Sequence, residues 1–267
     1  MRTELPYAAI LADERRLRLR RLGLVGGVLA VCVAALQITG FLDARRLIEG
    51  APALGQLFVE MVPPDFSRWQ SWLRPLLDTL AMSIAGTALA VAFSLPLAIL
   101  AARNTSPHPV VLHVTRLALS FLRSVPEIIM GIIFVAAVGF GALPGVLALG
   151  LHSVGMVGKF YAEAIEHVDP KPLEAARAAG AHPFQVITHA VLPQVMPQLA
   201  DITIYRWEYH FRASAVLGIV GAGGIGFELI AALRLIAYDQ VSAILLTILA
   251  CVVAVDSLGS RLRRALQ

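Results

Sequence analysis

Long apolar stretches alternate with short polar segments along most of this chain. A helix needs about 20 mainly apolar residues to cross the hydrocarbon core of a bilayer, and six stretches of this chain approach or exceed that length. The pattern therefore predicts an all-α polytopic membrane protein. The predicted spans are Leu22–Leu42, Leu76–Ala102, Ser124–Gly139, Leu143–Phe160, Val191–Tyr209 and Val241–Leu258.

Arginine is concentrated in particular polar segments. "RRLRLRR" closes the polar segment 1–21, Arg103–Arg123 is basic with almost no acid, and the chain ends in "SRLRRALQ". Because short basic loops mark the cytoplasmic side, we expect both termini in the cytoplasm and the protein in a bacterial inner membrane. The first apolar stretch is longer than the roughly 7 to 15 residues of a signal-peptide core, which favours an uncleaved helix.

The segment 43–75, between the first two spans, mixes charges of both signs and contains Trp69 and Trp72. Tryptophan favours the membrane interface, so we expect this segment on the outer face with both rings at the interface. The pattern does not define its internal structure. Pro96, inside the second span, is expected to bend that helix without ending it, since neighbouring helices can satisfy the freed carbonyl.

Composition supports the membrane assignment. The 267 residues are 58% hydrophobic and 15% charged, and the mean hydropathy is +0.75. A soluble domain of this size needs more charged surface, whereas helices in lipid expose apolar side chains without penalty. The net charge of +4 is explained by the topology signals and does not predict a nucleic-acid partner. Cys32 and Cys251 lie in apolar stretches, so we expect neither a disulfide framework nor a metal site.

The heptapeptide "VGAGGIG" fits G-x-G-x-x-G, the spacing of a dinucleotide-binding turn. That spacing binds a nucleotide only when a strand leads into it and a helix leaves it within a βαβ unit. Here it follows a predicted transmembrane helix, and the chain shows no alternation of strands and helices. Glycine is instead expected to support irregular backbone beside a pathway. A membrane-bound, nucleotide-dependent oxidoreductase is the alternative from another class of protein.

The most specific stretch is "EAARAAGAHPFQVITHAVLP". It lies in a polar segment, 161–193, whose prolines predict two short helices with a break. The stretch resembles the cytoplasmic EAA loop of ABC importer permeases, although Ala190 stands where isoleucine is usual. The resemblance implies that this segment couples the chain to an ATPase, whereas the alternative is an ordinary amphipathic surface helix. The matching residues are Glu174, Ala175, Ala176, Gly180, Leu192 and Pro193.

Further stretches from Leu76 to the C-terminus, including "RWEYHFRASAVLGIVGAGGIG", resemble permeases of phosphonate, phosphite and hypophosphite importers. The resemblance implies a type I ABC importer transmembrane domain over 22–267. It also implies a homodimer of permeases, two cytoplasmic ATPases that hold ATP and Mg²⁺, and an external binding protein, with no cofactor in this chain. An importer permease for another small solute, such as methionine, is the alternative within transport.

Arg206, Glu208 and Arg212 are ionisable residues in or beside the fifth span, and such residues mark polar pathways. We expect the two arginines to offer planar forks of donors to oxyanions, and the glycines that follow to line the same translocation path or gate. Two alternatives remain for the charged residues: a self-neutralising Glu208–Arg212 pair at i,i+4, and anchoring to lipid headgroups. The glycines are Gly221, Gly223, Gly224 and Gly226.

Pro126 and Glu127 open the third span, where proline and an acidic residue suit the first helical turn. The resemblance adds a second role for Arg123, Pro126 and Glu127, in a gate or in docking the ATPase. Lys159 and Glu163 are expected to form an i,i+4 pair beside Tyr161 at the membrane interface. No P-loop, G-x-S-x-G or zinc motif occurs. The chain is therefore expected not to be an enzyme, with ATP hydrolysis on another polypeptide.

Overall fold

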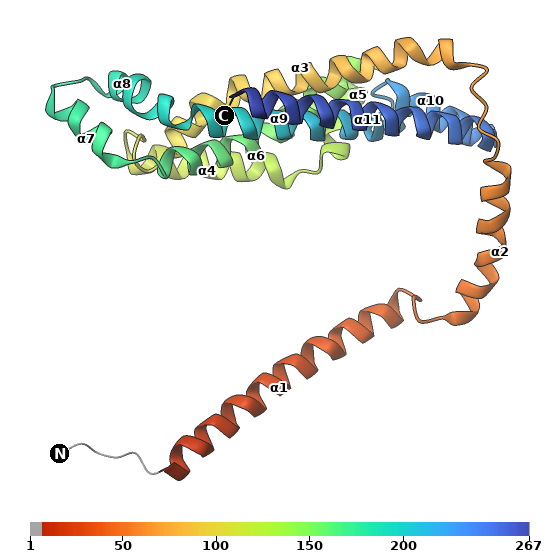
Figure 1. Cartoon of the computed structure of the whole chain (residues 1–267), viewed down its shortest axis with the longest axis horizontal. Coiled ribbons are helices and arrows are strands. Elements are labelled where there is room, and N and C mark those ends of the chain that lie inside the picture. Colours follow the sequence, from red (N-terminus) through yellow and green to blue (C-terminus); the bar gives the residue numbers. More distant parts are fainter. Residues whose placement is uncertain (1–6, 267) are drawn as a thin grey trace. The chain divides into compact units, whose positions relative to one another are not determined.

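The computed structural model describes residues 7–266, with side chains from residue 14 onward, and every regular element in that range is a helix (Figure 1). The chain divides into two compact units, residues 1–60 and 61–267. The helices are α1 (Tyr7–Ile38), α2 (Ala44–Glu60), α3 (Trp69–Ala101), α4 (Pro109–Ser124), α5 (Glu127–Val138), α6 (Ala142–Glu166), α7 (Pro170–Ala178), α8 (Pro183–Val186), a π-helical turn η1 (Ile187–Val191), α9 (Leu192–Leu217), a 3₁₀ turn η2 (Gly218–Val220), α10 (Ile225–Arg234) and α11 (Tyr238–Leu266).

The first unit consists of α1 and α2. Helix α1 carries an apolar stretch long enough to span a bilayer, Glu14–Ile38, and its side chains from Glu14 onward are exposed in this single chain. Residues 7–21 of the polar segment 1–21 therefore continue directly into the first predicted span. Residues 1–6 lie outside the described residues. Helix α2 fills much of the segment 43–75, whose structure the sequence left open.

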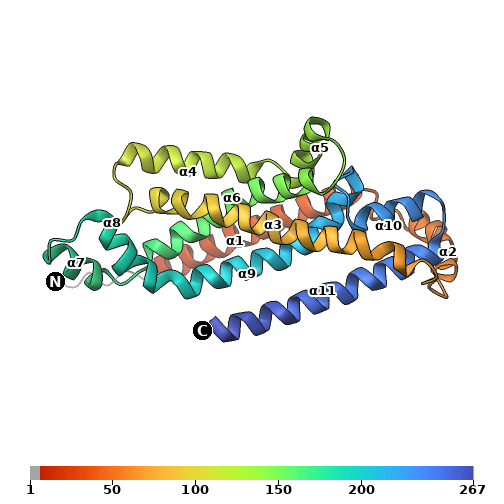
Figure 2. The same ribbon diagram turned by 90° about the horizontal axis from the view of Figure 1, so that it is seen from above.

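The second unit is a bundle built around α3, α6 and α9, with α11 packed on α9 and α4 on α6 (Figures 1 and 2). Small residues allow the close approach of α3 and α6, as is usual between membrane helices. A methyl group at Gly150 would overlap Leu89, and one at Gly145 would reach Met82. We call the end of the bundle that carries α7 and α8 the loop end, and the opposite end, where α10 turns into α11, the far end.

Within residues 7–266, four helices are long and apolar enough to cross a membrane, and the number rises to six when each of two bent pairs counts as one span. The predicted six spans agree with the larger number. The bent pairs are α4 with α5, which meet at 84°, and the stretch Pro183–Val220 with α10, which meet at 43°. Helix α3 continues through Pro96, as predicted, and α9 continues past Tyr209 to Leu217.

The sequence prediction treated Arg103–Arg123 as a polar connection between two spans, and the structure corrects it. Most of it forms α4, which packs lengthwise on α6. Its apolar residues repeat at helical spacing, and Gly155 and Gly158 of α6 leave room for it: a methyl group at Gly155 would lie 2.5 Å from the backbone oxygen of Leu119. The stretch 124–139 is therefore not one straight helix: α4 ends at Ser124, and α5 leaves it at 84°.

Two aromatic residues that were predicted at the membrane interface lie inside the bundle. Trp72 is 3% exposed and packs with Ile225 and Val241. Tyr161 is 1% exposed, and its hydroxyl contacts the hydroxyl of Thr203. Both rings therefore pack against other helices and do not face lipid, because position in the sequence shows how deep a ring lies along a helix but not which side of the helix it occupies. Trp69 is half exposed.

Candidate coupling segment and buried polar network

The polar segment after α6 folds as two short helices with a break, as predicted. Asp169 caps α7 by accepting a hydrogen bond from the backbone nitrogen of Lys171 at 3.0 Å. The chain leaves α7 through Gly180, whose φ of +82° is a left-handed conformation that glycine adopts without strain. The amide of Ala181 then donates to the carbonyl of Ala176 at 3.1 Å, which closes the helix C-terminus.

Helix α8 begins with a capping box. The His182 ring accepts from the amide of Phe184, and the Gln185 side chain accepts from the amide of His182 at 2.8 Å. A π-helical turn, Ile187–Val191, then joins α8 to α9. Leu192 and Pro193 form the first turn of α9 and follow the π-helical turn without a break.

The outward face of this segment is free for a partner. Glu174 and Ala175 are exposed, Ala176 is half-buried, and the ring of Phe184 is 69% exposed. The inward face is anchored to the bundle by Leu173, which is buried. Two polar contacts complete the attachment: the amide of Asp169 donates to Gln194 at 3.1 Å, and the guanidinium of Arg177 lies 3.5 Å from the carbonyl of Asn104.

A buried polar network crosses the middle of the bundle around His210, which is fully buried. The Nδ1 atom of His210 lies 2.7 Å from the Thr87 hydroxyl on α3, and Nε2 lies 2.6 Å from the Ser153 hydroxyl on α6. Because Thr87 donates its own proton to the carbonyl of Ser83 at 2.7 Å, it can only accept from His210. This pattern assigns the ring proton to Nδ1 and leaves Nε2 to accept from Ser153.

Arg206 extends this network. It is 4% exposed, its Nε donates to Ser153 at 2.8 Å, and its guanidinium carbon lies 4.1 Å from the centre of the Tyr209 ring. The Tyr209 hydroxyl donates to Glu127 at 2.9 Å. Within the described residues, the Nη2 atom of Arg206 and the Oε2 atom of Glu127 are buried without a hydrogen-bond partner. A buried cation without a carboxylate partner is costly unless it serves a function.

Glu208 and Arg212 lie apart from Arg206, on the side of α9 that faces α11. Arg263 of α11 approaches Glu208 with an N–O distance of 2.9 Å, and Arg212 donates to Asp256 of α11 at 2.9 Å. The i,i+4 pair between Glu208 and Arg212 does not form. Each side chain has a partner on the antiparallel neighbouring helix, so the two pairs join α9 to α11.

The glycine cluster packs closely against other helices. Gly221, Gly223 and Gly224 have φ values of +95°, +75° and +72°, which other residues adopt only with strain. A methyl group at Gly224 would overlap Thr79 and Met82 of α3, and one at Gly226 would overlap the carbonyl of Ala215. Helices lie on both sides of the segment, so the strand that a dinucleotide turn requires is not found in the described chain.

The comparisons with known proteins agree with this architecture. The family of binding-protein-dependent transport system inner membrane components matches residues 94–267, which is more than half of the chain. The chain belongs to this family. A phosphite transport system permease protein of Stutzerimonas stutzeri is 66% identical over 245 residues, which cover 92% of this chain and 89% of that protein.

A phosphate-import permease protein of Mycolicibacterium smegmatis is 44% identical over 220 residues, which cover 82% of this chain and 41% of that protein. Among solved structures, an inward-facing MetNI methionine ABC transporter superposes with a TM-score of 0.67 at 22% identity, covering 76% of this chain and 99% of that chain. The fold is therefore that of type I ABC importer permeases, as the sequence predicted.

The three predicted residues around the break between α4 and α5 make different contacts. Pro126 caps α5, and Glu127 joins the Arg206 network through Tyr209. Arg123 instead donates to the Ser120 hydroxyl one turn earlier on α4, at 3.1 Å. The predicted Lys159–Glu163 pair is confirmed, with an N–O distance of 3.4 Å.

The sequence analysis missed His210, Ser153, Thr87 and Tyr209. One signal was available, because "RWEYHF" places several polar side chains within one predicted span, and polar groups at that depth need partners. Their partners on α3 and α6 are single hydroxyl residues in apolar surroundings. No spacing in the sequence distinguishes those hydroxyls from others.

Proposed function

We propose that this chain is the permease subunit of an ATP-driven importer for phosphite or a similar small phosphorus oxyanion. In this proposal two copies form a homodimer, two cytoplasmic ATPases supply the energy, and an external binding protein delivers the anion. The loop end and both termini face the cytoplasm. The relative that is 66% identical and described as a phosphite transport permease supports this substrate class.

The coupling segment, Pro170–Val191, supports the ATPase partner. Its exposed small residues Ala175 and Ala178 allow close approach of another protein, and Phe184 offers a large apolar anchor. Its inward face is tied to the bundle near the start of α9. Movement imposed on the segment is therefore transmitted to α9, the helix that carries Arg206.

The observation that carries the anion path is Arg206. Its charge lies near the middle of α9, about 20 Å from the start of that helix at 1.5 Å per residue, and one terminal nitrogen has no partner. A phosphorus oxyanion has several acceptor oxygens, and a guanidinium offers donors in a matching fork. Arg212 and Glu208 form ion pairs with Asp256 and Arg263 of α11, so the proposed anion contact falls on Arg206 alone.

Tyr209 and Glu127 provide a cover for this site. The Tyr209 ring lies over the guanidinium and is held by its hydrogen bond to Glu127 at the start of α5. When the two permeases rock against each other, a shift of α5 relative to α9 would break this bond and uncover Arg206. The anion then binds weakly on one side and leaves on the other, as alternating access requires.

The deciding experiment measures phosphite uptake by proteoliposomes that contain the permease, its ATPases and its binding protein. Arg206→Gln should lower uptake at least about tenfold, because a charge-assisted hydrogen bond contributes roughly 1.5–3 kcal/mol. Arg206→Lys should retain part of the activity. Arg212→Gln, which removes the same charge from a half-exposed pair, is the matched control and should transport near the wild-type rate.

Both variants must assemble with the ATPases and show ATPase activity stimulated by the binding protein. If an assembled Arg206→Gln transporter moves phosphite as fast as the wild type, the anion contact is wrong. Uptake of methionine in place of phosphite by the wild-type transporter would reject the substrate class and leave the importer assignment intact.

A further inference from the structure

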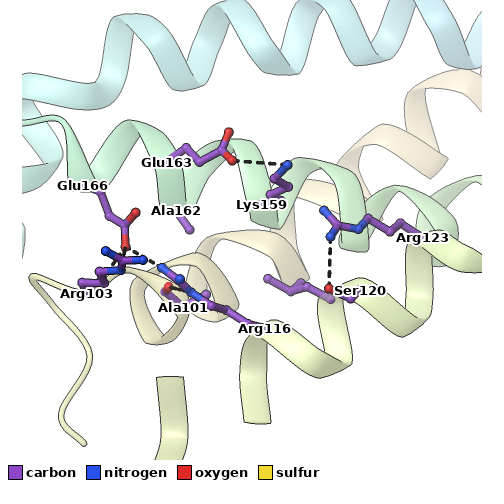
Figure 3. A pocket seen from close by; sticks show the side chains of 10 residues that line it. Ala101, Arg103, Arg116, Ser120, Arg123, Lys159, Ala162, Glu163 and Glu166 are labelled. Carbon is purple, nitrogen blue, oxygen red and sulfur yellow. Dashed lines mark hydrogen bonds and ion pairs between the residues drawn. The ribbon is translucent and has the colours of Figure 1, made fainter. Parts of the chain in front are cut away.

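A second polar site lies at the loop end, between the end of α3, α4 and the last turns of α6 (Figure 3). It is a cavity of about 300 Å³, a volume at the lower end of the range for small-molecule sites. None of its lining residues belongs to the network around Arg206. The lining residues are Ala101, Arg103, Arg116, Leu119, Ser120, Arg123, Lys159, Ala162, Glu163 and Glu166.

The walls of this cavity are fixed in place by helix packing. Helix α4 touches α6 at Gly155 and Gly158, where an added methyl group would collide with Leu119 and Arg123. The end of α3 forms the third wall. Arg116 of α4 holds it in place, because its Nε donates to the carbonyl of Ala101 over 2.9 Å. The cations on α4 and α6 therefore face each other across a gap of defined width.

The cavity carries an excess of positive charge, since four cationic side chains and two carboxylates line it. Glu166 is shared by Arg116, with an N–O distance of 2.5 Å, and by Arg103 at 3.9 Å. Lys159 has Glu163 at 3.4 Å. Figure 3 shows that Arg123 contacts only a hydroxyl, that of Ser120, so its charge has no carboxylate partner among the described residues.

These groups match the chemistry of a phosphate-type anion. Arginine presents donors in a planar fork, and lysine adds a compact charge, which together suit a tetrahedral group with several oxygens. Basic pockets between membrane helices on the cytoplasmic side bind the headgroups of anionic lipids. A tetrahedral phosphate group has oxygens that point in several directions, so one group can accept from donors on both α4 and α6.

We propose that this cavity binds a phosphate-type anion between Arg123 of α4 and Lys159 of α6. The anion is either the headgroup of an anionic phospholipid or free inorganic phosphate. The site differs from the transport path, and its occupancy does not depend on which solute the permease carries. Because α6 ends at Glu166, just before the coupling segment, a bound anion would stiffen the base from which that segment extends.

The test compares the double variant Arg123→Gln/Lys159→Gln with the wild type in the full-length permease purified with its ATPases. The matched control is Arg234→Gln/Arg261→Gln, which removes two cations from exposed positions outside both the cavity and the coupling segment. In the first arm, native mass spectrometry counts phosphatidylglycerol molecules retained by each transporter. In the second arm, titration calorimetry in lipid-free detergent measures binding of inorganic phosphate.

We expect the double variant to weaken one of these interactions at least about tenfold, while the control leaves it unchanged. Loss of one retained phosphatidylglycerol per chain identifies a lipid headgroup as the anion. Loss of saturable phosphate binding identifies a free anion. If the double variant binds phosphatidylglycerol and inorganic phosphate as the wild type does, or if the wild type binds neither, the proposal is overturned. The conservative variant Arg123→Lys/Lys159→Arg should keep most of the binding.

Discussion

At the scale of single residues, His210 connects three helices through its two ring nitrogens. Thr87 of α3 and Ser153 of α6 each contact one nitrogen, and Ser153 also accepts from Arg206. Because these side chains are buried away from solvent, each of them depends on the others for its hydrogen bonds. The network therefore sets both the packing of the bundle and the orientation of the Arg206 side chain.

His210→Phe should lower the stability of the permease by about 1–3 kcal/mol, since the Ser153 hydroxyl loses its acceptor and Thr87 loses a donor. The measurement is the apparent melting temperature of the purified permease in detergent. His113→Phe on the exposed face of α4 is the control and should leave that temperature unchanged. Equal melting temperatures for the His210 and His113 variants would show that the network contributes nothing.

At the scale of helices, Gly259 determines how closely α11 approaches α9. A methyl group at this position would collide with the carboxylate of Glu208, which lies between the two helices and pairs with Arg263. Arg263 also lies 3.8 Å from Asp201, about two turns of α9 farther toward the loop end. The close contact of α9 and α11 therefore depends on the absence of a side chain at Gly259 as well as on the opposite charges of Glu208 and Arg263.

Gly259→Ala should separate α11 from α9 and weaken the pair of Glu208 with Arg263. We expect a loss of roughly 1–3 kcal/mol, the usual cost of added volume in a packed interior, read as a lower melting temperature of the purified permease. Gly23→Ala, where no atom lies near the added methyl, provides the comparison. A stabilising effect at Gly259 would mean that the helices have room to separate without loss.

At the scale of the whole molecule, the two ends of the bundle expose different surfaces. The loop end presents the coupling segment with Phe184 exposed, whereas the far end presents Phe140 and Phe227. The proposed function requires these ends to face opposite sides of the membrane, with an ATPase on only one of them. One prediction tests the ATPase partner, and a second tests the orientation of the protein in the membrane.

Phe184→Ala should reduce assembly with the ATPase about tenfold or more, since a buried aromatic anchor typically contributes at least 2 kcal/mol to an interface. Co-purification of the ATPase with tagged permease measures the effect. Phe227→Ala removes a ring of similar exposure from the far end and should leave assembly intact. Equal losses in both variants would point to a general folding defect.

The orientation is tested by cysteine labelling in intact cells, in a permease whose Cys32 and Cys251 are replaced by alanine. A cysteine at Phe140 should react with a membrane-impermeant maleimide from outside, because that position is 84% exposed at the far end. A cysteine at Glu174 should react only after the cells are opened. External labelling of Glu174→Cys would invert the topology and reject the coupling role.

Many structural features of this protein follow from the pattern of residues within short stretches of the chain. Apolar length predicted the four helices that are long enough to cross a membrane by themselves, and prolines predicted the break between α7 and α8. Gly180, one of the residues that match the EAA loop, has a left-handed conformation just after α7. Lys159 and Glu163 pair because residues four apart lie on one face of a helix. In each case the cause acts within a few residues of the chain, so the order of residues is sufficient.

Other features depended on which helices became neighbours. Glu208 and Arg212 had the spacing for a pair with each other, yet α11 supplied both with other partners. Trp72 and Tyr161 are amphipathic rings that suit either an interface or a core, and packing placed both inside. The sequence by itself determined the helices and the coupling segment, since these follow from length, periodicity and turn chemistry. Only the tertiary structure decided the partners of the buried polar groups, because those partners lie far away in the sequence and only the packing of the helices brings them together.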